Sequence, residues 1–445
     1  MNYVVIGGDA AGMSAAMEIY RHDSEAHIIT LEKGFHYSYG QCGLPYVLDG
    51  RIENAEDVVH KTAAQFKDKY GIDTREGHCV TAVHPKEKMV SGFDVQTKET
   101  FEIAYDRLII ATGASQKRVL KDEAYNLEGI YFFKTITQTK QLQQAMNDAE
   151  VVTIIGGGYI ALELAETLTM AGKKVRMLIR GQQVVSFLES DFAEMIHEEL
   201  RQKGVDVLFN EQLVSYDGDG HGHVSSVKTT TATYDTDIVI EAVGVKPSTD
   251  FVKDSGIHML RNGAIVVDSH METNIPSIYA AGDCATHYHM IKGQNTYLPL
   301  GTTANKQGRI AGLNMAGIPE QFKGIVGSAI LKCFDLEIGT TGLIEKELKD
   351  LNIPYEVVTF KTGNHAGYYP NVEKLHLKMY WRKDDQRLLG LRVIGKKGVD
   401  KRIDVFATAL YHASTLRQLI DLDLSYAPPF NSVWDPIQQL AKRQF

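Results

Sequence analysis

The sequence has few cysteines and no excess of positive charge. Its 445 residues include four cysteines, Cys42, Cys79, Cys284 and Cys333, which are too far apart for a zinc pattern or a dense disulfide framework. The formal net charge of -9 argues against a nucleic-acid surface, which ordinarily needs a basic patch. No apolar run approaches the ~18 residues that span a bilayer, and Met1 is not followed by a cationic leader. We expect no nucleic-acid partner, no membrane association and a reducing, cytoplasmic setting.

Metal-ligating side chains form no clear set either. His287 and His289 flank Tyr288, but this spacing lies on an undefined loop and has no third ligand. The sequence therefore predicts no metal site.

The segment from Ser38 to Tyr46 carries one cysteine, Cys42, among residues that break regular structure. Gly40, Gly43 and Pro45 interrupt both helix and strand ladders. This pattern favours display of Cys42 on a loop or at a helix start, where its thiol can react. The alternative is a small buried side chain, which is what most free cysteines are.

A first dinucleotide motif opens the chain. The strand-like residues 3–6 lead into Gly7 and Gly12, a helical segment follows, and a second strand over 27–31 ends at Glu32. This spacing is typical of a Rossmann unit, in which the carboxylate meets the ribose 2′-hydroxyl. The middle glycine of the motif is replaced by Asp9, so an unrelated strand-turn-helix is the alternative.

A second motif follows about 150 residues later. Residues 151–155 form a strand that enters Gly156, Gly158 and Ala161, and a helix is predicted from Leu162. Its second strand places Ile179 and Arg180 where the first motif has Glu32. The carboxylate that favours NADH is missing, and Arg180 could meet a 2′-phosphate.

Three further strands place this second motif inside the first unit. Residues 108–111 close on Thr112 and Gly113, residues 238–243 close on a glycine, and residues 277–281 close on Gly282 and Asp283. Residues 300–309 are predicted to be a loop entering a helix, which makes Asn305, Lys306 and Arg309 available to anions at or near the helix start. The alternative for these three residues is a solvated face.

The last third of the chain has a different composition. From about residue 324, strand-like runs at 355–360, 375–381 and 388–394 alternate with helical segments. Tyr368 and Tyr369 precede a proline, and Tyr426 precedes two more. We predict an α/β protein with two Rossmann-like dinucleotide-binding domains, the second inserted in the first (1–115 with 247–323, and 116–246), and a C-terminal α+β domain (324–445).

With these motifs in this order, the whole chain resembles the pyridine nucleotide-disulfide oxidoreductases. The resemblance implies that the first motif binds FAD, the inserted one binds NAD(P)H, and the last domain makes a homodimer. It assigns FAD contacts to Gly7, Gly12, Glu32, Thr112, Gly113 and Asp283. It assigns nicotinamide-nucleotide contacts to Gly156, Gly158, Tyr159, Ala161, Glu163 and Arg180, with Tyr159 gating the nicotinamide pocket.

Within this family, the chain resembles the single-cysteine branch of NADH oxidases, NADH peroxidases and coenzyme A disulfide reductases. Ser38 and Cys42 match its SxxxC motif, and a second nearby cysteine is absent. Peroxidases and water-forming oxidases look to have a histidine where this chain has Ala10. The tyrosines before proline resemble those of the coenzyme A disulfide reductases.

The resemblance implies reduction of coenzyme A (CoA) disulfide by NADPH, with NADH as an alternative, through a covalent Cys42-S-S-CoA mixed disulfide. Tyr426 and Tyr368 of the other subunit would protonate the leaving thiolate, and the choice between Tyr368 and Tyr369 stays open. Ser38, Asn305, Arg21, Lys306 and Arg309 are the predicted CoA-binding residues. Two alternatives remain: an NAD(P)H oxidase or peroxidase using a Cys42 sulfenic acid, and a flavin-bearing redox sensor.

Overall fold

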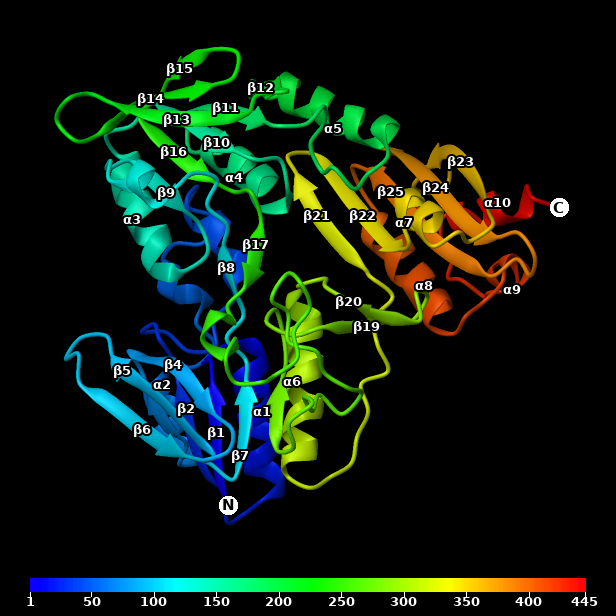
Figure 1. Ribbon diagram of the computed structural model, residues 1–445. Helices are drawn as coiled ribbons and strands as arrows, with labels where there is room; N and C mark the ends of the chain where they lie inside the picture. The colour runs from blue at the N-terminus through cyan, green and yellow to red at the C-terminus, as the bar shows by residue number, and fades with distance from the viewer.

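The computed structural model describes residues 1–445, except for the side chain of Asp122. Three five-stranded sheets form its framework, and smaller antiparallel sheets lie beside them. Figure 1 shows the N-terminal sheet at the bottom, the central part of the chain at the upper left and the C-terminal sheet at the upper right.

The first large sheet is fully parallel, with strand order β18-β7-β1-β2-β3. Helices α1 and α6 pack closely because Gly308 and Gly312 of α6 lie against Ala11 and Ala15 of α1. The elements of this part are β1 (Asn2–Ile6), α1 (Ala10–His22), β2 (His27–Leu31), the 3-10 helices η1 (Gln41–Val47) and η2 (Ala55–Val58), α2 (Ala63–Tyr70), β3 (Asp73–Arg75), the antiparallel β4 (His78–His84), β5 (Met89–Asp94) and β6 (Thr100–Ala104), then β7 (Arg107–Ile110), β18 (Ile278–Ala280) and α6 (Gly301–Met315).

The second large sheet repeats this plan, with order β12-β11-β10-β16-β9 and all pairs parallel. In both sheets the strand that precedes the glycine loop is central, which is the usual place of a nucleotide crevice. Its elements are η3 (Asp122–Tyr125), β9 (Ile130–Phe132), α3 (Ile136–Met146), β10 (Val151–Ile155), α4 (Tyr159–Met170), β11 (Lys174–Ile179), α5 (Ser190–Gln202), β12 (Asp206–Phe209), the antiparallel β13 (Leu213–Gly218), β14 (Val224–Thr229) and β15 (Thr233–Asp235), and β16 (Ile238–Glu241).

Two short strands, β8 (Ala114–Gln116) and β17 (Val245–Pro247), connect the two parallel sheets. They pair antiparallel with each other, and Figure 1 shows them running side by side between the two parts. The chain therefore leaves the first part and returns to it at one place.

The C-terminal sheet is antiparallel, with order β21-β22-β25-β24-β23. Helices α8 and α10 share its hydrophobic core. The elements of this part are β21 (Ala329–Cys333), β22 (Leu336–Gly342), α7 (Glu345–Asp350), β23 (Tyr355–Gly363), β24 (Lys374–Arg382), β25 (Leu388–Gly395), α8 (Val399–Tyr411), α9 (Leu416–Ile420) and α10 (Pro436–Lys442). Earlier in the chain, the 3-10 helix η4 (Asp250–Val252) contacts β4 of the first part, and β19 (His287–His289) and β20 (Gln294–Thr296) form a separate antiparallel hairpin.

Two helices begin earlier than the sequence predicted. Helix α4 begins at Tyr159 rather than Leu162, and α6 begins at Gly301. The last residues of a glycine loop can form the first turn of the helix that follows, because the first four N–H groups of any helix have no intrahelical partner. As a consequence, Asn305, Lys306 and Arg309 lie in the second and third turns of α6 rather than at its start.

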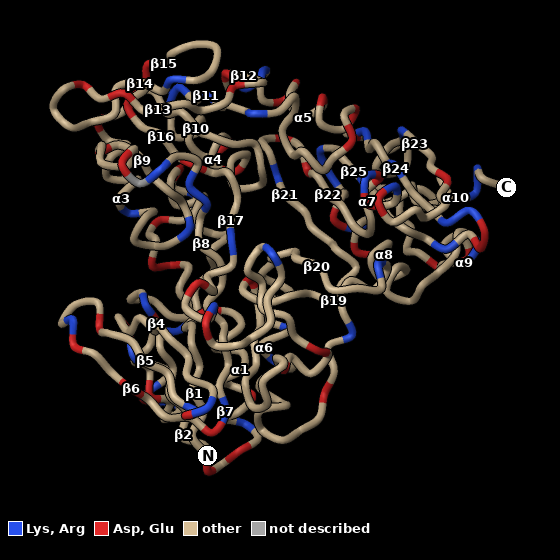
Figure 2. Tube along the Cα trace, in the orientation of Figure 1, with Lys and Arg blue, Asp and Glu red and all other residues tan. Residues whose placement is uncertain are grey.

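Residues of both charges are interspersed along the whole trace (Figure 2). Among the residues that the structure describes, no helix combines the length and the apolar character needed to cross a membrane.

Candidate active site

Cys42 is the second residue of the 3-10 helix η1 and is exposed. The rest of η1 is anchored, because Leu44 and Val47 are buried in a hydrophobic cluster that also contains residues of α3 and α4. The Cys42 segment thus belongs to the first part of the chain but packs on the second. This position brings the thiol between the two nucleotide units.

The surroundings of Cys42 favour its protonated form. Partial burial of the thiol raises its pKa, and the neighbouring Glu163, Asp283 and Asp9 raise it further, while Lys134 lowers it. Glu163 is itself perturbed: burial, together with the charge of Glu166, raises its pKa to about 7. The site therefore holds a carboxylate that titrates near neutrality beside a nucleophile.

Asp9, the residue that interrupts the first glycine motif, holds the cysteine loop in place. Its carboxylate accepts hydrogen bonds from the Gln41 side-chain amide (2.8 Å) and from the Tyr39 backbone N–H (3.2 Å). The Lys134 ammonium donates to Gln41 Oε1 (2.8 Å). This chain of contacts joins the glycine loop, the residue before Cys42 and the second part of the molecule.

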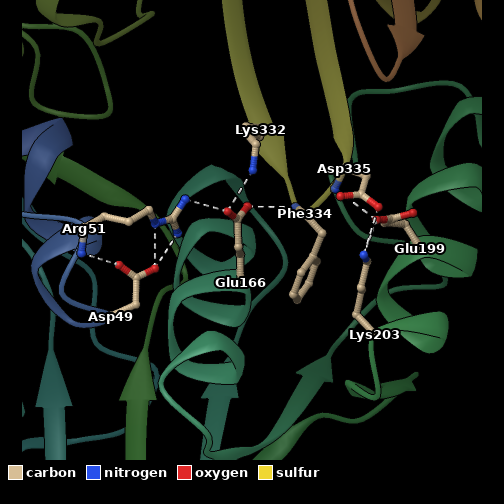
Figure 3. A network of polar contacts seen from close by, with 8 residues as sticks. All are labelled: Asp49, Arg51, Glu166, Glu199, Lys203, Lys332, Phe334 and Asp335. Atoms are coloured by element: carbon tan, nitrogen blue, oxygen red, sulfur yellow. Dashed lines mark hydrogen bonds and ion pairs between the residues drawn. The ribbon is translucent and has the colours of Figure 1, made fainter. Parts of the chain in front are cut away.

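A buried ion network fixes the other end of the Cys42 segment (Figure 3). Glu166 of α4 is 1% exposed, and its carboxylate accepts bonds from Arg51 Nη1 (2.8 Å), Lys332 Nζ (3.0 Å) and the Phe334 N–H (2.7 Å). Arg51 also pairs with Asp49. A single carboxylate therefore links the segment after η1, helix α4 and strand β21.

The same network continues along α5. Asp335 donates its N–H to Glu199 Oε1 (3.0 Å), and its carboxylate accepts from Lys203 Nζ (2.9 Å). The turn between β21 and β22 is thereby tied to helices α4 and α5.

The first glycine loop has the shape expected of a dinucleotide cradle. Gly7 has φ +115°, and a Cβ there would lie 2.2 Å from Ala111 O. A Cβ on Gly12 would lie 1.9 Å from Gly7 O. Glu32 accepts the N–H groups of Gly8 (2.8 Å) and Gly34 (2.7 Å), and each of its oxygens keeps a lone pair for a hydroxyl.

Two further residues predicted to contact FAD, Thr112 and Gly113, lie where the chain passes between the two parallel sheets. Thr112 Oγ1 donates to Ser248 O (2.8 Å), and Gly113 O accepts from Ser248 N (2.9 Å). Asp283 follows β18, and burial raises its pKa.

The second glycine loop reproduces the backbone of the first. Gly156 has φ +120° and faces Ala242 O as Gly7 faces Ala111 O. An added Cβ on Gly158 meets nothing within 4 Å, Ala161 is fully buried, and the Tyr159 ring contacts Phe187 edge-on at 5.3 Å. Arg180 is exposed directly after β11.

The structure pairs Tyr368 with Tyr426. Their hydroxyl oxygens are 2.7 Å apart, and the residues are 75% and 44% exposed. Tyr369 instead packs its ring edge-on against His365 at 5.5 Å. This geometry favours Tyr368 over Tyr369 as the functional partner of Tyr426.

The predicted CoA-binding residues are not all brought together. Asn305 accepts from Ser14 Oγ (2.9 Å) across the α1–α6 contact, and Lys306 and Arg309 are exposed on the same helix. Ser38 lies in the loop before Cys42, whereas Arg21 lies in the last turn of α1 and pairs with Glu18. These residues are spread over the loop before Cys42, the end of α1 and helix α6.

Sequence reasoning missed the supporting residues. Asp9 stood out only as a departure from a motif, and nothing local predicts the bonds of Gln41 to Asp9 and Lys134 or the Arg51–Glu166 pair, because these partners are distant in sequence. Among the described residues, no group of three or more His, Cys, Asp or Glu side chains is arranged to hold a metal ion; His287 and His289 are buried, and burial lowers the pKa of each to about 4.

Comparison with known proteins identifies the class. Residues 1–308 match the model of the pyridine nucleotide-disulphide oxidoreductases, and residues 328–436 match the model of their dimerisation domain. The chain belongs to the pyridine nucleotide-disulphide oxidoreductase family, as the sequence predicted, and its fold class is confirmed. It is an oxidoreductase of a family that uses FAD and NAD(P)H.

Individual relatives are similar over the full length. A coenzyme A disulfide reductase of Staphylococcus epidermidis is 32% identical, with 98% of this chain and 97% of that protein covered. An NADH oxidase of Methanocaldococcus jannaschii is also 32% identical, over 99% and 98% of the two chains. The crystal structure of reduced Bacillus anthracis CoADR-RHD superposes with a TM-score of 0.95 at 33% identity, covering 99% of this chain and 79% of that one.

The residues present fit a dinucleotide in each loop. The cradle at Gly7 and Gly12 leaves room for backbone approach but none for a Cβ, and both loops open directly into a helix N-terminus, where phosphate oxygens find unpaired N–H groups.

Proposed function

We propose that this chain reduces coenzyme A disulfide to two CoA thiols through a Cys42-S-S-CoA mixed disulfide, with NADPH as electron donor. The observation that carries the proposal is the exposed Cys42 between the two nucleotide units, while Cys284 and Cys333 are buried. A lone reactive cysteine needs a substrate that brings its own sulfur. The full-length likeness to a coenzyme A disulfide reductase supports this choice.

In the first half of the reaction, the Cys42 thiolate attacks one sulfur of the CoA disulfide. The substrate S–S bond breaks, one CoA leaves as a thiolate and takes a proton, and the other CoA stays bound to Cys42. Burial and the charge of Glu163 raise the pKa of Cys42, whereas the charge of Lys134 lowers it. Lys134 therefore stabilises the thiolate.

In the second half, two electrons cleave the Cys42-S-S-CoA bond, which releases the second CoA and restores the Cys42 thiolate. FAD, when bound, would carry these electrons from the nicotinamide to the disulfide. Residues 1–115 and 247–323 would bind FAD and residues 116–246 would bind NAD(P)H, with Arg180 facing the 2′-phosphate of NADPH.

The proton for the leaving thiolate comes from the Tyr368–Tyr426 pair of the other subunit. A phenol, with an ordinary pKa near 10, is a competent donor to a departing thiolate. Around this pair Phe430 (71%), Val433 (69%) and Trp434 (42%) are exposed. An apolar surface of this kind marks an interface, and together with the match to a dimerisation domain it supports a homodimer.

The setting proposed is the cytoplasm, where reducing conditions keep thiols free. All four cysteines are free in the structure.

The test combines mass and turnover. The intact mass of the purified protein is expected to fall by one CoA upon reduction, and Cys42→Ser should lose both this adduct and all CoA-disulfide turnover. Cys79→Ser is the matched control and should keep both. Disulfide reduction that survives in Cys42→Ser would exclude the mechanism.

The similarity to an NADH oxidase favours a second candidate, oxygen or peroxide reduction through a Cys42 sulfenic acid. Turnover with CoA disulfide, oxygen and peroxide should be compared on one preparation. Fast peroxide turnover without CoA-disulfide turnover would establish this alternative instead.

A further inference from the structure

The two loops that carry Tyr368 and Tyr426 are joined by one buried side chain, Arg402 of α8. Arg402 is 2% exposed. Its Nη2 donates both to Asn364 O (2.8 Å) and to Asn431 Oδ1 (3.1 Å). The two acceptors belong to the two tyrosine loops, which are otherwise distant in sequence.

The Tyr368 loop is closed where Arg402 binds it. Asn364 N donates to Glu373 O (2.9 Å), and Glu373 N donates to Asn364 Oδ1 (3.0 Å). These paired bonds form the base of the segment 364–373, with Tyr368 near its tip. Fixing Asn364 therefore fixes the base of the loop.

The Tyr426 loop is held on both sides of the tyrosine. The Asn431 side-chain amide donates to Ser425 O (3.2 Å), and its backbone N–H donates to Ala427 O (3.1 Å). Asn431 is 1% exposed. Asn431, which accepts the Arg402 bond, therefore binds both residues that flank Tyr426 in sequence.

The guanidinium is itself held firmly. Nη1 donates to Gly398 O (2.9 Å), and the guanidinium forms an ion pair with Asp435, whose Oδ2 lies 3.3 Å from Nε without hydrogen-bond geometry. Asp435 is 2% exposed and accepts the Ile437 N–H at the start of α10 (3.1 Å). A planar fork with five donors can serve these directions at once, which a lysine ammonium cannot.

We propose that Arg402 is a positioning residue that holds the Tyr368 and Tyr426 hydroxyls within hydrogen-bond distance and so makes the pair an effective proton donor. This inference rests on the proposed function of the two tyrosines. Arg402 acts through Asn364 and Asn431 and touches no substrate atom.

The catalytic test is a single turnover of the reduced, FAD-loaded enzyme with CoA disulfide, in which thiol release is measured. Tyr426→Phe should slow release by about 10²-fold, the lower end of general acid catalysis. Arg402→Lys should slow it by about 10-fold, and the double variant should be no slower than Tyr426→Phe, because coupled residues are not additive. Reduction of the enzyme by NADPH should be unchanged.

Arg392→Lys is the matched control. Arg392 is fully buried in β25, the strand against which α8 packs, and donates to backbone carbonyl oxygens of Thr341, Leu391 and Leu343 rather than to the tyrosine loops. In the double variant, the slowing of thiol release by Arg392→Lys should multiply with the slowing by Tyr426→Phe. The positioning role is excluded if the slowing of thiol release by Arg402→Lys also multiplies with that by Tyr426→Phe. It is likewise excluded if Arg402→Lys slows reduction of the enzyme by NADPH as much as it slows thiol release. If Arg402→Lys does not fold, Asn431→Ala takes its place with the same expectations.

A second readout does not depend on catalysis. Oxidative dityrosine cross-linking, followed by peptide mapping, measures how often Tyr368 and Tyr426 lie together. The yield should fall several-fold in Arg402→Lys and stay unchanged in Arg392→Lys. An unchanged yield in Arg402→Lys overturns the inference. If Tyr368→Phe and Tyr426→Phe leave thiol release unchanged while the cross-link still depends on Arg402, the proton-donor role fails and the positioning of the pair stands.

Discussion

The two glycine loops have the same backbone conformation and differ in the side chains beside it. Gly7 N donates to Leu31 O (2.8 Å), and Gly156 N donates to Leu178 O (3.0 Å), which makes Glu32 and Ile179 structurally equivalent. Ile179 is buried, so Arg180, one residue further, presents the charge instead. This difference supports the proposed binding of a ribose 2′-hydroxyl beside Glu32 and of a 2′-phosphate beside Arg180.

The helices after the loops differ in the same way. Position 14 in α1 corresponds to position 163 in α4, counting from the equivalent glycines. Ser14 binds Asn305 and serves helix packing, whereas Glu163 lies by Cys42 and raises its pKa. The backbone is repeated, but the side chains at equivalent positions differ, and only the one on α4 acts on the pKa of Cys42.

The largest expected effect concerns the backbone conformation that the two loops have in common. Gly12→Ala would place a Cβ 1.9 Å from Gly7 O, so α1 must move away from β1. We expect the free energy of unfolding to fall by about 3 kcal/mol and most of the bound FAD to be lost, measured by denaturant melts and flavin absorbance per chain. The equivalent residue of α4 is already alanine, so Ala161→Gly should retain FAD.

The next effect concerns Glu32. Glu32→Ala leaves the Gly8 and Gly34 N–H groups without their acceptor, which costs about 2 kcal/mol. FAD affinity should weaken together with stability. The matching change in the second loop, Ile179→Ala, removes a buried apolar group and should lower stability without affecting FAD; equal flavin loss in both would mean that the carboxylate is not a ligand.

A smaller effect concerns coenzyme choice. Arg180→Ala should raise KM for NADPH about 10-fold, the loss of one charge-assisted bond, and leave KM for NADH nearly unchanged. Arg176→Ala is the control, since Arg176 lies on the same strand but pairs with Asp206 (2.9 Å). An unchanged NADPH-to-NADH ratio in Arg180→Ala removes the assignment.

The smallest effect is on pH dependence. Since Glu163 raises the pKa of Cys42, Glu163→Gln should shift the alkylation profile of Cys42 to lower pH by less than about one unit. With a Glu163 pKa of about 7 against 4.5, the folded state holds more protons between these values. The free energy of unfolding therefore falls as pH rises through this window, and Glu163→Gln should flatten that fall. An unshifted alkylation profile would show that the two groups do not interact.

The elements that the sequence predicted well depend on local patterns. Strand 27–31 and strand 151–155 have the predicted bounds, because β-branched runs ending at a glycine loop or a carboxylate give sharp signals. Helix starts were less well predicted, since a glycine loop hides the first turn.

The supporting residues of the site could not be predicted in this way. Asp9 bonds Gln41, Arg51 bonds Glu166, and Arg402 bonds Asn364 and Asn431 across 29 to 115 positions of sequence. Such pairs carry no periodicity and become visible only after the sheets are assembled. The choice between Tyr368 and Tyr369 likewise needed the geometry of a loop, because adjacent tyrosines are indistinguishable in sequence.

The antiparallel pair β8 and β17 has a consequence for how this architecture can arise and be modified. Since Lys117 N meets Gly244 O (3.0 Å) and Ser248 N meets Gly113 O (2.9 Å), the insert begins and ends at neighbouring points. The host chain would close across that gap with a tight turn. Exchange of the whole segment between these points is therefore the change expected to disturb the host sheet least, and it would carry the proposed NAD(P)H site with it.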